Sequence, residues 1–365
     1  MVDAARAGTA APAAVPPPAG RPGRRLRRRP SRIRGRQALA GWLFVAPALL
    51  GLGLFLVAPI LMAFWVSFRD WSGLAPLDTS TPTGTENYRD LLVESGVVQS
   101  DFAKSLRNNF YYVLGVVPAQ TALSFFLAVV VNSKLLKGKT FFRTAFYFPS
   151  VTSSIAVAFI FIFLFSPSGV VNVLLSALLP GTVETVWLSE FKGVVHTVLG
   201  WLGVDTAPAF LGEHRLMGLS YWDWLSGPSV ALLAIMILAT WTTTGTFMLM
   251  FLAGLQNIPE ELDEASLIDG ATPRQRFFRV TLPLMRPTLF LVLTLGLIGT
   301  WQVFDQIYAM TAGGPQKTTL TPAYLIYRDG FENSAMGRAA AIAFILFALI
   351  LAFTGIQRLL LRRED

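Results

Sequence analysis

The chain has 365 residues, of which 53% are hydrophobic and only 14% are charged. Because a soluble domain carries about a quarter charged residues, this composition argues against a soluble globular protein and indicates that a lipid bilayer is the surrounding solvent. The chain contains no cysteine, which excludes a disulfide framework and a thiolate metal site.

An arginine-rich N-terminal segment accounts for the net charge of +8. Residues 1–36 hold ten arginines and one acidic residue, Asp3, so they contribute +9 and leave −1 for the rest of the chain. The segment lacks the apolar content needed to fold. We expect a disordered cytoplasmic tail that sets topology and contacts anionic lipid. The alternative is a nucleic-acid-binding arm, but the segment holds no aromatic residue, and we expect no nucleic-acid partner.

Six segments are long and apolar enough to cross a bilayer, which takes about 20 residues for about 30 Å of hydrocarbon. They cover about residues 38–68, 110–131, 144–165, 229–252, 287–309 and 339–356. The first is too long for the core of a signal peptide and has no cleavage site at its end. We therefore predict an all-α polytopic membrane domain over residues 37–365, with about six transmembrane helices.

Lysine and arginine residues indicate the orientation, because cytoplasmic loops carry an excess of both. They gather in loop 132–143, in loop 253–286 and after the sixth segment, whereas the longer loops on the other side hold more acidic than basic residues. Both termini are therefore predicted to be cytoplasmic. Residues 169–205 are apolar but interrupted by Pro180 and Gly181, which favours short surface helices; a seventh span is the alternative.

Only two charged residues fall within a predicted span or at its mouth. Asp305 lies near the outer end of the fifth span, and Arg338 lies at the outer start of the sixth. Charged residues in membrane segments usually pair. We therefore expect a structural ion pair between Asp305 and Arg338 near the outer interface, with a role in an outer gate as the alternative.

The loop between the fourth and fifth spans, residues 253–286, has the signals of two short helices separated by a break. Pro259 suits a first helical position, and the acidic residues after it favour the positive end of the helix dipole. Asp269-Gly270 predicts the end of this helix, because glycine readily adopts the left-handed stop. Thr272 then caps the next helix, with Gln275 at capping-box spacing. We predict an ordered cytoplasmic elbow.

The elbow also carries a spaced motif. Glu264-Ala265-Ser266 is followed after three residues by Gly270, and after nine more by Val280-Thr281-Leu282-Pro283. This pattern resembles the EAA loop of the permease subunits of type I ABC importers, with Ser266 in place of the second alanine and Val280 in place of the usual isoleucine. Residues 251–259 and 304–315 resemble the carbohydrate-uptake branch, on the side of the maltose and glycerol-3-phosphate permeases. The resemblance covers about residues 38–360.

This resemblance implies a transport protein that is not an enzyme and binds no cofactor or metal itself. The elbow would form a coupling helix that docks in a groove of a cytoplasmic ATPase dimer, with Glu264 at the contact and Gly270 permitting the turn. The coupling residues implied are Glu264, Ala265, Ser266, Asp269, Gly270, Ala271, Leu282 and Pro283. A membrane-surface hairpin without a partner is the alternative.

ATP is expected to be used by another chain, because this sequence has no complete P-loop. Gly138-Lys139-Thr140 has the right last three residues, but Ser133 stands where the earlier glycine is required, so the phosphate cradle would be incomplete. The resemblance further implies alternating access in the bacterial inner membrane. Its expected partners are a second, non-identical permease and an extracytoplasmic solute-binding protein.

A sugar or sugar-like molecule is the solute that the resemblance implies, with glycerol-3-phosphate or a related phosphodiester as the alternative. A hydroxyl-rich ligand needs hydrogen-bonding groups and aromatic faces along an apolar path. Helix packing is the alternative role of each such side chain in the spans. The candidates are Asn109, Tyr112, Gln120, Trp241, Thr244, Trp301, Gln302, Asp305 and Tyr308.

Two other classes of protein compete with the importer. A membrane-embedded transferase would need clustered acidic residues or histidines near a membrane face, but His196 and His214 lack carboxylate spacing that suggests a metal. A self-sufficient secondary carrier would need no elbow and usually shows paired half repeats. The elbow therefore favours the importer.

Overall fold

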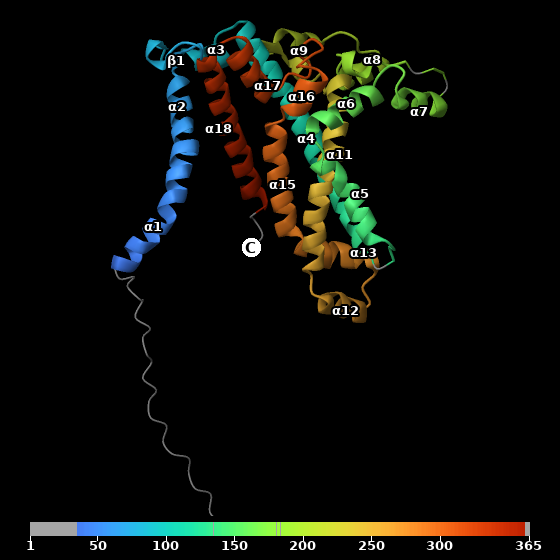
Figure 1. Cartoon of the computed structure of the whole chain (residues 1–365). Helices are drawn as coiled ribbons and strands as arrows, with labels where there is room; N and C mark the ends of the chain where they lie inside the picture. Colours follow the sequence, from blue (N-terminus) through green and yellow to red (C-terminus); the bar gives the residue numbers. More distant parts are fainter. Residues whose placement is uncertain (1–34, 134, 180, 183, 362–365) are drawn as a thin grey trace, which may run out of the picture. The chain divides into compact units, whose positions relative to one another are not determined.

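The computed structural model describes residues 35–133, 135–179, 181–182 and 184–361. These residues are folded mainly into helices (Figure 1), which confirms the predicted all-α class. The chain divides into two compact units, Met1–Ala58 and Pro59–Asp365. The predicted basic tail lies outside the described residues as far as residue 34, so its disorder stays a prediction.

The described part of the first unit is a helix, α1 (Gly35–Leu52), followed by a π-helical turn, η1 (Gly53–Val57). Residues 39–58 include no charged residue, and large apolar side chains such as Trp42, Phe44 and Phe55 are exposed. A helix that is apolar on all sides is typical of a membrane span or of a deep core. A candidate membrane span begins here and covers Leu39–Val66.

The other elements follow in chain order. Those before the long helix α11 are α2 (Ala58–Val66), β1 (Arg69–Asp70), η2 (Leu77–Thr79), β2 (Thr81–Pro82), α3 (Glu86–Leu92), α4 (Val97–Asn132), α5 (Lys139–Val151), α6 (Ser154–Leu164), α7 (Val170–Leu178), η3 (Trp187–Ser189), α8 (Val194–Trp201), α9 (Ala209–Glu213), β3 (Arg215–Leu216), β4 (Leu219–Ser220) and α10 (Tyr221–Trp224). The rest are α11 (Val230–Gln256), α12 (Glu260–Ile268), α13 (Pro273–Arg276), η4 (Phe277–Thr281), α14 (Leu282–Leu284), α15 (Arg286–Trp301), α16 (Asp305–Met310), α17 (Pro322–Tyr327), η5 (Arg328–Glu332) and α18 (Met336–Leu361).

Four helices among the described residues are long and apolar enough to span a membrane, and two bent helix pairs raise the number to as many as six. The straight candidates are Leu39–Val66, Val97–Asn132, Val230–Gln256 and Met336–Leu359. The prediction of about six spans agrees with this count if each bent pair is one span. Residues 169–205 hold the short elements α7, η3 and α8, as predicted, and no seventh candidate appears in the part of the chain that is described.

Three predicted spans differ from the helices observed. Helix α4 begins at Val97 instead of residue 110, because polar side chains of its first turns are buried against residues 317–328. The third predicted span is broken: α5 and α6 meet at 97° across Thr152 and Ser153, whose backbone angles are not helical. The fifth helix, α15, ends at Trp301 instead of Ala309, and α16 follows as a separate short helix.

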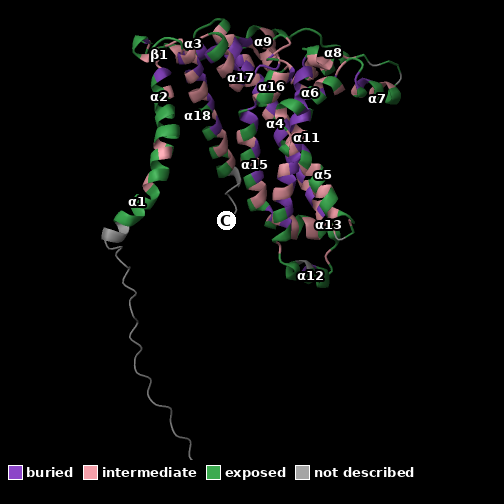
Figure 2. Cartoon of the chain, viewed as in Figure 1, coloured by how far each residue is buried: buried purple, intermediate pink, exposed green. Residues whose placement is uncertain are grey.

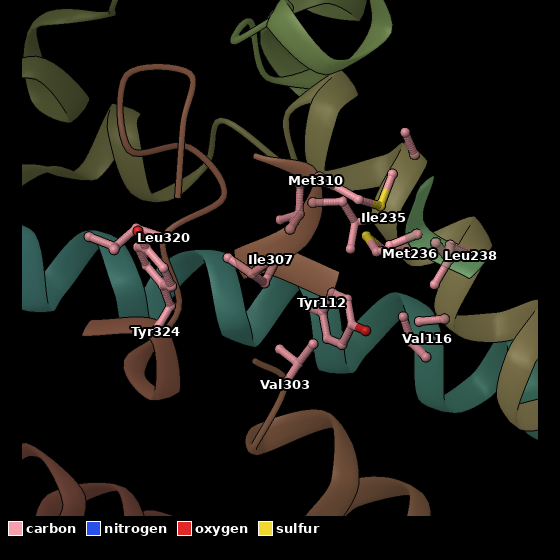
Figure 3. Packing of buried hydrophobic residues seen from close by; sticks show 14 of the residues in the cluster. Tyr112, Val116, Ile235, Met236, Leu238, Val303, Ile307, Met310, Leu320 and Tyr324 are labelled. Carbon is pink, nitrogen blue, oxygen red and sulfur yellow. The ribbon is translucent and has the colours of Figure 1, made fainter. Parts of the chain in front are cut away.

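Helices α4 and α11 form the centre of the second unit, and the buried residues concentrate along them (Figure 2). One hydrophobic cluster joins α4, α11, α16 and α17 through residues such as Tyr112, Ile235, Ile307 and Tyr324 (Figure 3). A second cluster joins the later turns of α4 and α11 to α15, with Phe251 at its middle. Side chains from separate stretches of the sequence therefore pack together between these helices.

Helix α5 approaches α11 at Gly245, where no side chain could be accommodated. A Cβ atom at this position would lie 2.3 Å from the carbonyl oxygen of Phe146 and 2.8 Å from the Cα of Tyr147. The Ser150 hydroxyl fastens the same contact, because it donates to the Thr242 carbonyl at 2.5 Å and accepts from the Thr246 N–H at 3.2 Å. Small residues at such crossings let membrane helices pack closely.

Candidate functional site

The predicted elbow, residues 253–286, lies at one end of the second unit, where α12 projects beyond the ends of α11 and α5 (Figure 1). Helix α12 starts one residue later than predicted, since Pro259 is its N-cap and Glu260 its first residue. It ends as the sequence predicts: Gly270 has a φ of +74°, in the left-handed region. The N–H of Ala271 donates to the Ser266 carbonyl, and that of Gly270 to the Leu267 carbonyl, which is a Schellman stop.

The second helix of the elbow, α13, begins at the predicted capping box. The Gln275 N–H donates to the Thr272 hydroxyl at 3.3 Å, and the Thr272 N–H donates to the Gln275 side-chain oxygen at 2.8 Å. These reciprocal bonds satisfy two donors that a helix start leaves unpaired. The chain then continues through η4 and α14, which holds Leu282 and Pro283, and bends by 64° into α15.

Helix α12 exposes most of its side chains, including large apolar ones. Leu262 and Leu267 are exposed, Ile268 is 87% exposed, and Glu264, Ala265, Asp269 and Gly270 are also exposed. Ser266 is the buried member of the predicted coupling set. A cavity of about 670 Å³ lies behind the helix, lined by residues that include Glu264, Arg276 and Gln256. A nine-residue helix gains little stability by itself in water, so this surface suits a partner.

A second cavity, of about 230 Å³, lies between the middle of α4, α11 and α15. Its lining is apolar with a few polar groups, and Asp305 is the one charged residue among the lining residues. The Thr243 hydroxyl donates to the Gln120 side-chain oxygen at 2.6 Å, while the buried Gln120 Nε2 has no hydrogen-bond partner within the described residues. A buried donor without a partner has a free-energy cost, so Gln120 contributes an uncompensated polar group to the lining of this cavity.

The cavity brings together only some of the side chains that the sequence singles out. Tyr112, Gln120, Gln302 and Asp305 line it. Asn109 is buried and donates to the Trp301 carbonyl, Trp241 packs against Phe161, Thr244 bonds within α11, and Tyr308 lies in an aromatic cluster described below. The lining also includes four residues that are not among the predicted solute-path candidates: Thr243, Gly296, Phe304 and Gln306.

Helical spacing could have identified one of these missing residues. Tyr112 and Gln120 are eight residues apart, so they share a face of α4. On α11, Ala239, Thr243 and Phe247 lie on one face at intervals of four and line the cavity. Thr244 is one residue further on, and its side chain is therefore rotated by about 100° from this face.

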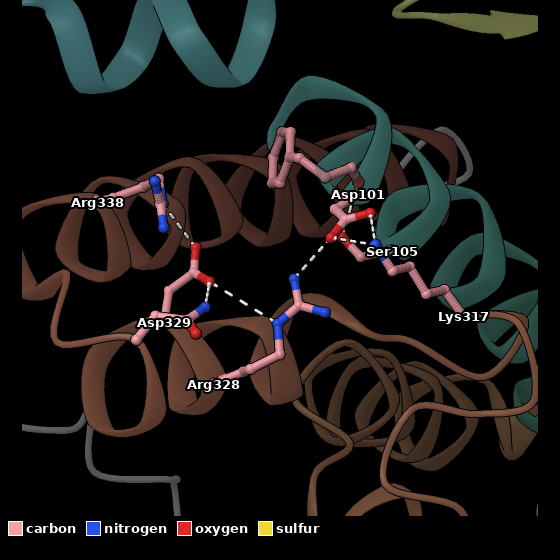
Figure 4. Close-up of polar contacts among 8 residues, drawn as sticks. Asp101, Ser105, Lys317, Arg328, Asp329 and Arg338 are labelled. Carbon is pink, nitrogen blue, oxygen red and sulfur yellow. Dashed lines mark hydrogen bonds and ion pairs between the residues drawn. The ribbon is translucent and has the colours of Figure 1, made fainter. Parts of the chain in front are cut away.

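The predicted ion pair between Asp305 and Arg338 is wrong. Arg338 Nε lies 2.8 Å from Asp329 Oδ2 (Figure 4), and Asp305 forms no ion pair among the described residues. Asp329 precedes Arg338 by nine residues, on η5, and this turn folds back on the start of α18. Asp305 instead lies at the cavity, because α15 ends at Trp301 and the chain turns before α16.

A buried carboxylate at the end of the second unit opposite α12 was also missed. Asp101, on the first turns of α4, is 7% exposed in its side chain. Lys317 Nζ lies 2.6 and 2.8 Å from its two oxygens, and Arg328 lies 2.8 Å from one of them (Figure 4). Asn108 donates to the carbonyls of Lys317 and Leu320. These contacts hold loop 311–321, which includes the end of the 304–315 stretch that resembles the carbohydrate-uptake branch, against α4.

Comparison with known proteins identifies the family of this chain. A family model described as "binding-protein-dependent transport system inner membrane component" matches residues 120–365. The probable ABC transporter permease protein YurN of Bacillus subtilis is 30% identical over 318 residues, which is 87% of this chain and 94% of that protein. The multiple sugar-binding transport system permease protein MsmF of Streptococcus mutans is 30% identical over 310 residues, 85% of this chain and 91% of that protein.

Solved structures show the same fold. A chain of a bacterial alginate ABC transporter, in complex with an alginate pentasaccharide-bound periplasmic protein, superposes with a TM-score of 0.66 at 20% identity, over 91% of this chain and 98% of that one. These relatives are ABC-transporter permeases, which are transport proteins and not enzymes. They confirm the prediction of a transport protein and the resemblance to the permease subunits of ABC importers. The chain belongs to the family of inner membrane components of binding-protein-dependent transport systems, as an ABC-transporter permease.

Proposed function

We propose that this chain is the permease subunit of a sugar importer, and that α12 docks on a separate cytoplasmic ATPase. The exposed surface of α12 carries the proposal. A short helix that ends in a Schellman stop and exposes Leu262, Leu267 and Ile268 to water presents an apolar surface suited to contact with another chain. The acidic residue Glu264 on the same helix adds a charged contact for specificity.

The solute in this proposal passes along the cavity between α4, α11 and α15. Polar groups on Gln120, Thr243 and Gln302 and the ring of Tyr112 suit a neutral hydroxyl-rich molecule. The names of relatives agree with a sugar: they include a multiple sugar-binding system, arabinooligosaccharide systems and, at 29% identity over 87% of this chain, the lactose permease LacF of Rhizobium radiobacter.

The glycerol-3-phosphate alternative gains no support from the cavity. An anionic phosphodiester is bound by cations, and the cavity lining contains Asp305 and no lysine or arginine. In the full importer we propose two ATPase copies, a second permease that supplies the other side of the path, and an extracytoplasmic binding protein. The end of the second unit that holds α12 is then cytoplasmic, together with both termini.

Exchanging Glu264 for lysine is expected to release the ATPase. We would co-express the chain with the ATPase, second permease and binding protein from neighbouring genes, purify it in detergent, and measure the ATPase retained. Glu264→Lys should reduce retention at least about tenfold, because it reverses a charge at the contact. Gly270→Pro should do the same by removing the left-handed stop.

Glu213→Lys provides the control, because it makes the same charge change at an exposed position on α9 at the opposite end. It should retain the ATPase fully. If the wild-type chain itself retains no ATPase, the elbow is a surface hairpin and the proposal fails. ATP-independent uptake by the chain alone in proteoliposomes would instead indicate a secondary carrier.

A further inference from the structure

Four aromatic side chains form a continuous row beside the cavity. The ring centroids of Phe331 and Tyr327 are 5.6 Å apart, those of Tyr327 and Tyr308 are 5.3 Å apart, and those of Tyr308 and Phe304 are 5.5 Å apart. Tyr327 also lies 5.4 Å from Phe304. We call Phe304, Tyr308, Tyr327 and Phe331 the aromatic row. Its members come from α16 with the residue before it, from α17 and from η5.

The aromatic row is open to a visiting molecule. Phe331 is 69% exposed and Tyr308 is 45% exposed, while Tyr327 and Phe304 are half-buried. Buried Tyr324 supports the row from behind, with its ring centroid 6.2 Å from that of Tyr327. A side-chain hydrogen bond with Tyr308 raises the pKa of Tyr327, and a phenol of ordinary pKa is already neutral at physiological pH. The row therefore presents uncharged aromatic faces and hydroxyl groups.

One end of the aromatic row reaches the cavity. Phe304 lines the cavity together with Gln302, Asp305 and Gln306. Phe331, at the other end, lies on η5, two residues after Asp329 of the ion-pair network. That network fixes η5 against α4 and α18 and so holds Phe331 and Tyr327 in place. The row thus connects an exposed ring at the end of the second unit opposite α12 with this cavity.

A sugar ring has faces of C–H groups and edges of hydroxyl groups. Aromatic rings cover the C–H faces, and phenol hydroxyls form hydrogen bonds with the hydroxyl groups at the edges. We propose that the aromatic row is a binding track on which sugar rings stack in turn while they pass from Phe331 to the cavity. This inference rests on the proposed sugar import. Tyrosine rings also occur at membrane interfaces, but a lipid-facing set of rings has no need to end at a cavity with polar side chains, as this row does at Phe304.

The test uses the complete importer in proteoliposomes, with ATP inside, binding protein outside, and radiolabelled lactose and arabinotriose as probes. The variants Tyr327→Leu and Phe331→Leu remove a ring but keep an apolar side chain of moderate size. One stacked ring lost from the path should lower the uptake rate about fivefold. Tyr327→Phe keeps the ring and should restore most of the rate.

Phe210→Leu is the matched control. Phe210 on α9 is also an exposed aromatic residue in a cluster, with His214 and Tyr221, and lines neither cavity. Its uptake should equal that of the wild type. Unchanged uptake in both row variants, with wild-type uptake present, would overturn the track and leave the importer standing.

Two further outcomes also count against the track. If the row variants lose the second permease from the purified complex, the aromatic row is a subunit contact. If the wild-type importer takes up neither probe while it hydrolyses ATP, the sugar assignment itself fails, and the track fails with it. These outcomes are read from the subunit composition and from the wild-type control in the same experiment.

Discussion

Replacing Asp101 by alanine is expected to destabilise the protein by about 3 kcal/mol. The carboxylate is buried and is shared by Lys317 and Arg328, at 2.6 to 2.8 Å. Removing one partner of a buried ion pair lowers the free energy of unfolding by about 3–5 kcal/mol, because the remaining charge is left buried without a counter-charge. Both cations here are partly exposed, so water can solvate them and the lower figure applies. Thermal unfolding in detergent, followed by circular dichroism, should occur at least about 5 °C earlier.

An exposed ion pair in the same region is the matched control for Asp101. Arg89 and Glu94 lie 3.0 Å apart with both side chains largely exposed. Such pairs contribute about 0–1 kcal/mol, so Glu94→Ala should unfold within about 1 °C of the wild type. If Asp101→Ala unfolds at the same temperature as Glu94→Ala, the network of Figure 4 does not stabilise the fold.

Replacing Gly245 by leucine is expected to separate α5 from α11. The added side chain would meet the Phe146 carbonyl and the Tyr147 Cα, and these backbone atoms cannot turn away as a side chain can. Overpacking of this kind costs about 1–3 kcal/mol, and more where the backbone must move. We expect at least about 3 kcal/mol of destabilisation, since the Ser150 bonds to Thr242 and Thr246 are lost as well.

Cross-linking measures this separation directly. Cysteines placed at Tyr147 and Thr246 in the cysteine-free chain should cross-link in the wild-type background and not in Gly245→Leu. Gly355→Leu is the control, because a Cβ at this position of α18 meets nothing within 4 Å and leucine favours helix more than glycine does. Full cross-linking in Gly245→Leu would show that the crossing tolerates a large side chain.

The elbow could be predicted from the sequence because its determinants are local. A left-handed glycine, a capping box and acidic residues at a helix start act within a few residues, and Gly270, Thr272 and Gln275 behave as their spacing predicts. The start of α12 differs from the predicted start by one residue. The length and apolar content of the spans are likewise local properties, and they predicted the approximate number of spans.

The contacts of charged residues could not be predicted in the same way. Asp101 and its partner Lys317 are 216 residues apart, and no periodicity links them. Asp101 also lies in a polar extension of α4 that a hydropathy window assigns to a loop. The Asp305 prediction failed for a related reason: α15 stops at Trp301, so a helical projection beyond that residue places Asp305 wrongly.

Helix α11 touches both cavities with one uninterrupted element. Thr243 lines the central cavity, Gln256 lines the cavity behind α12, and no proline lies anywhere in the helix. At 1.5 Å per residue these two positions are about 20 Å apart along a rod. A tilt of about 10° imposed at the elbow would therefore swing the cavity wall by roughly 3 Å. Under the proposed docking of α12 on an ATPase, movement at the elbow is therefore expected to shift the cavity wall through α11.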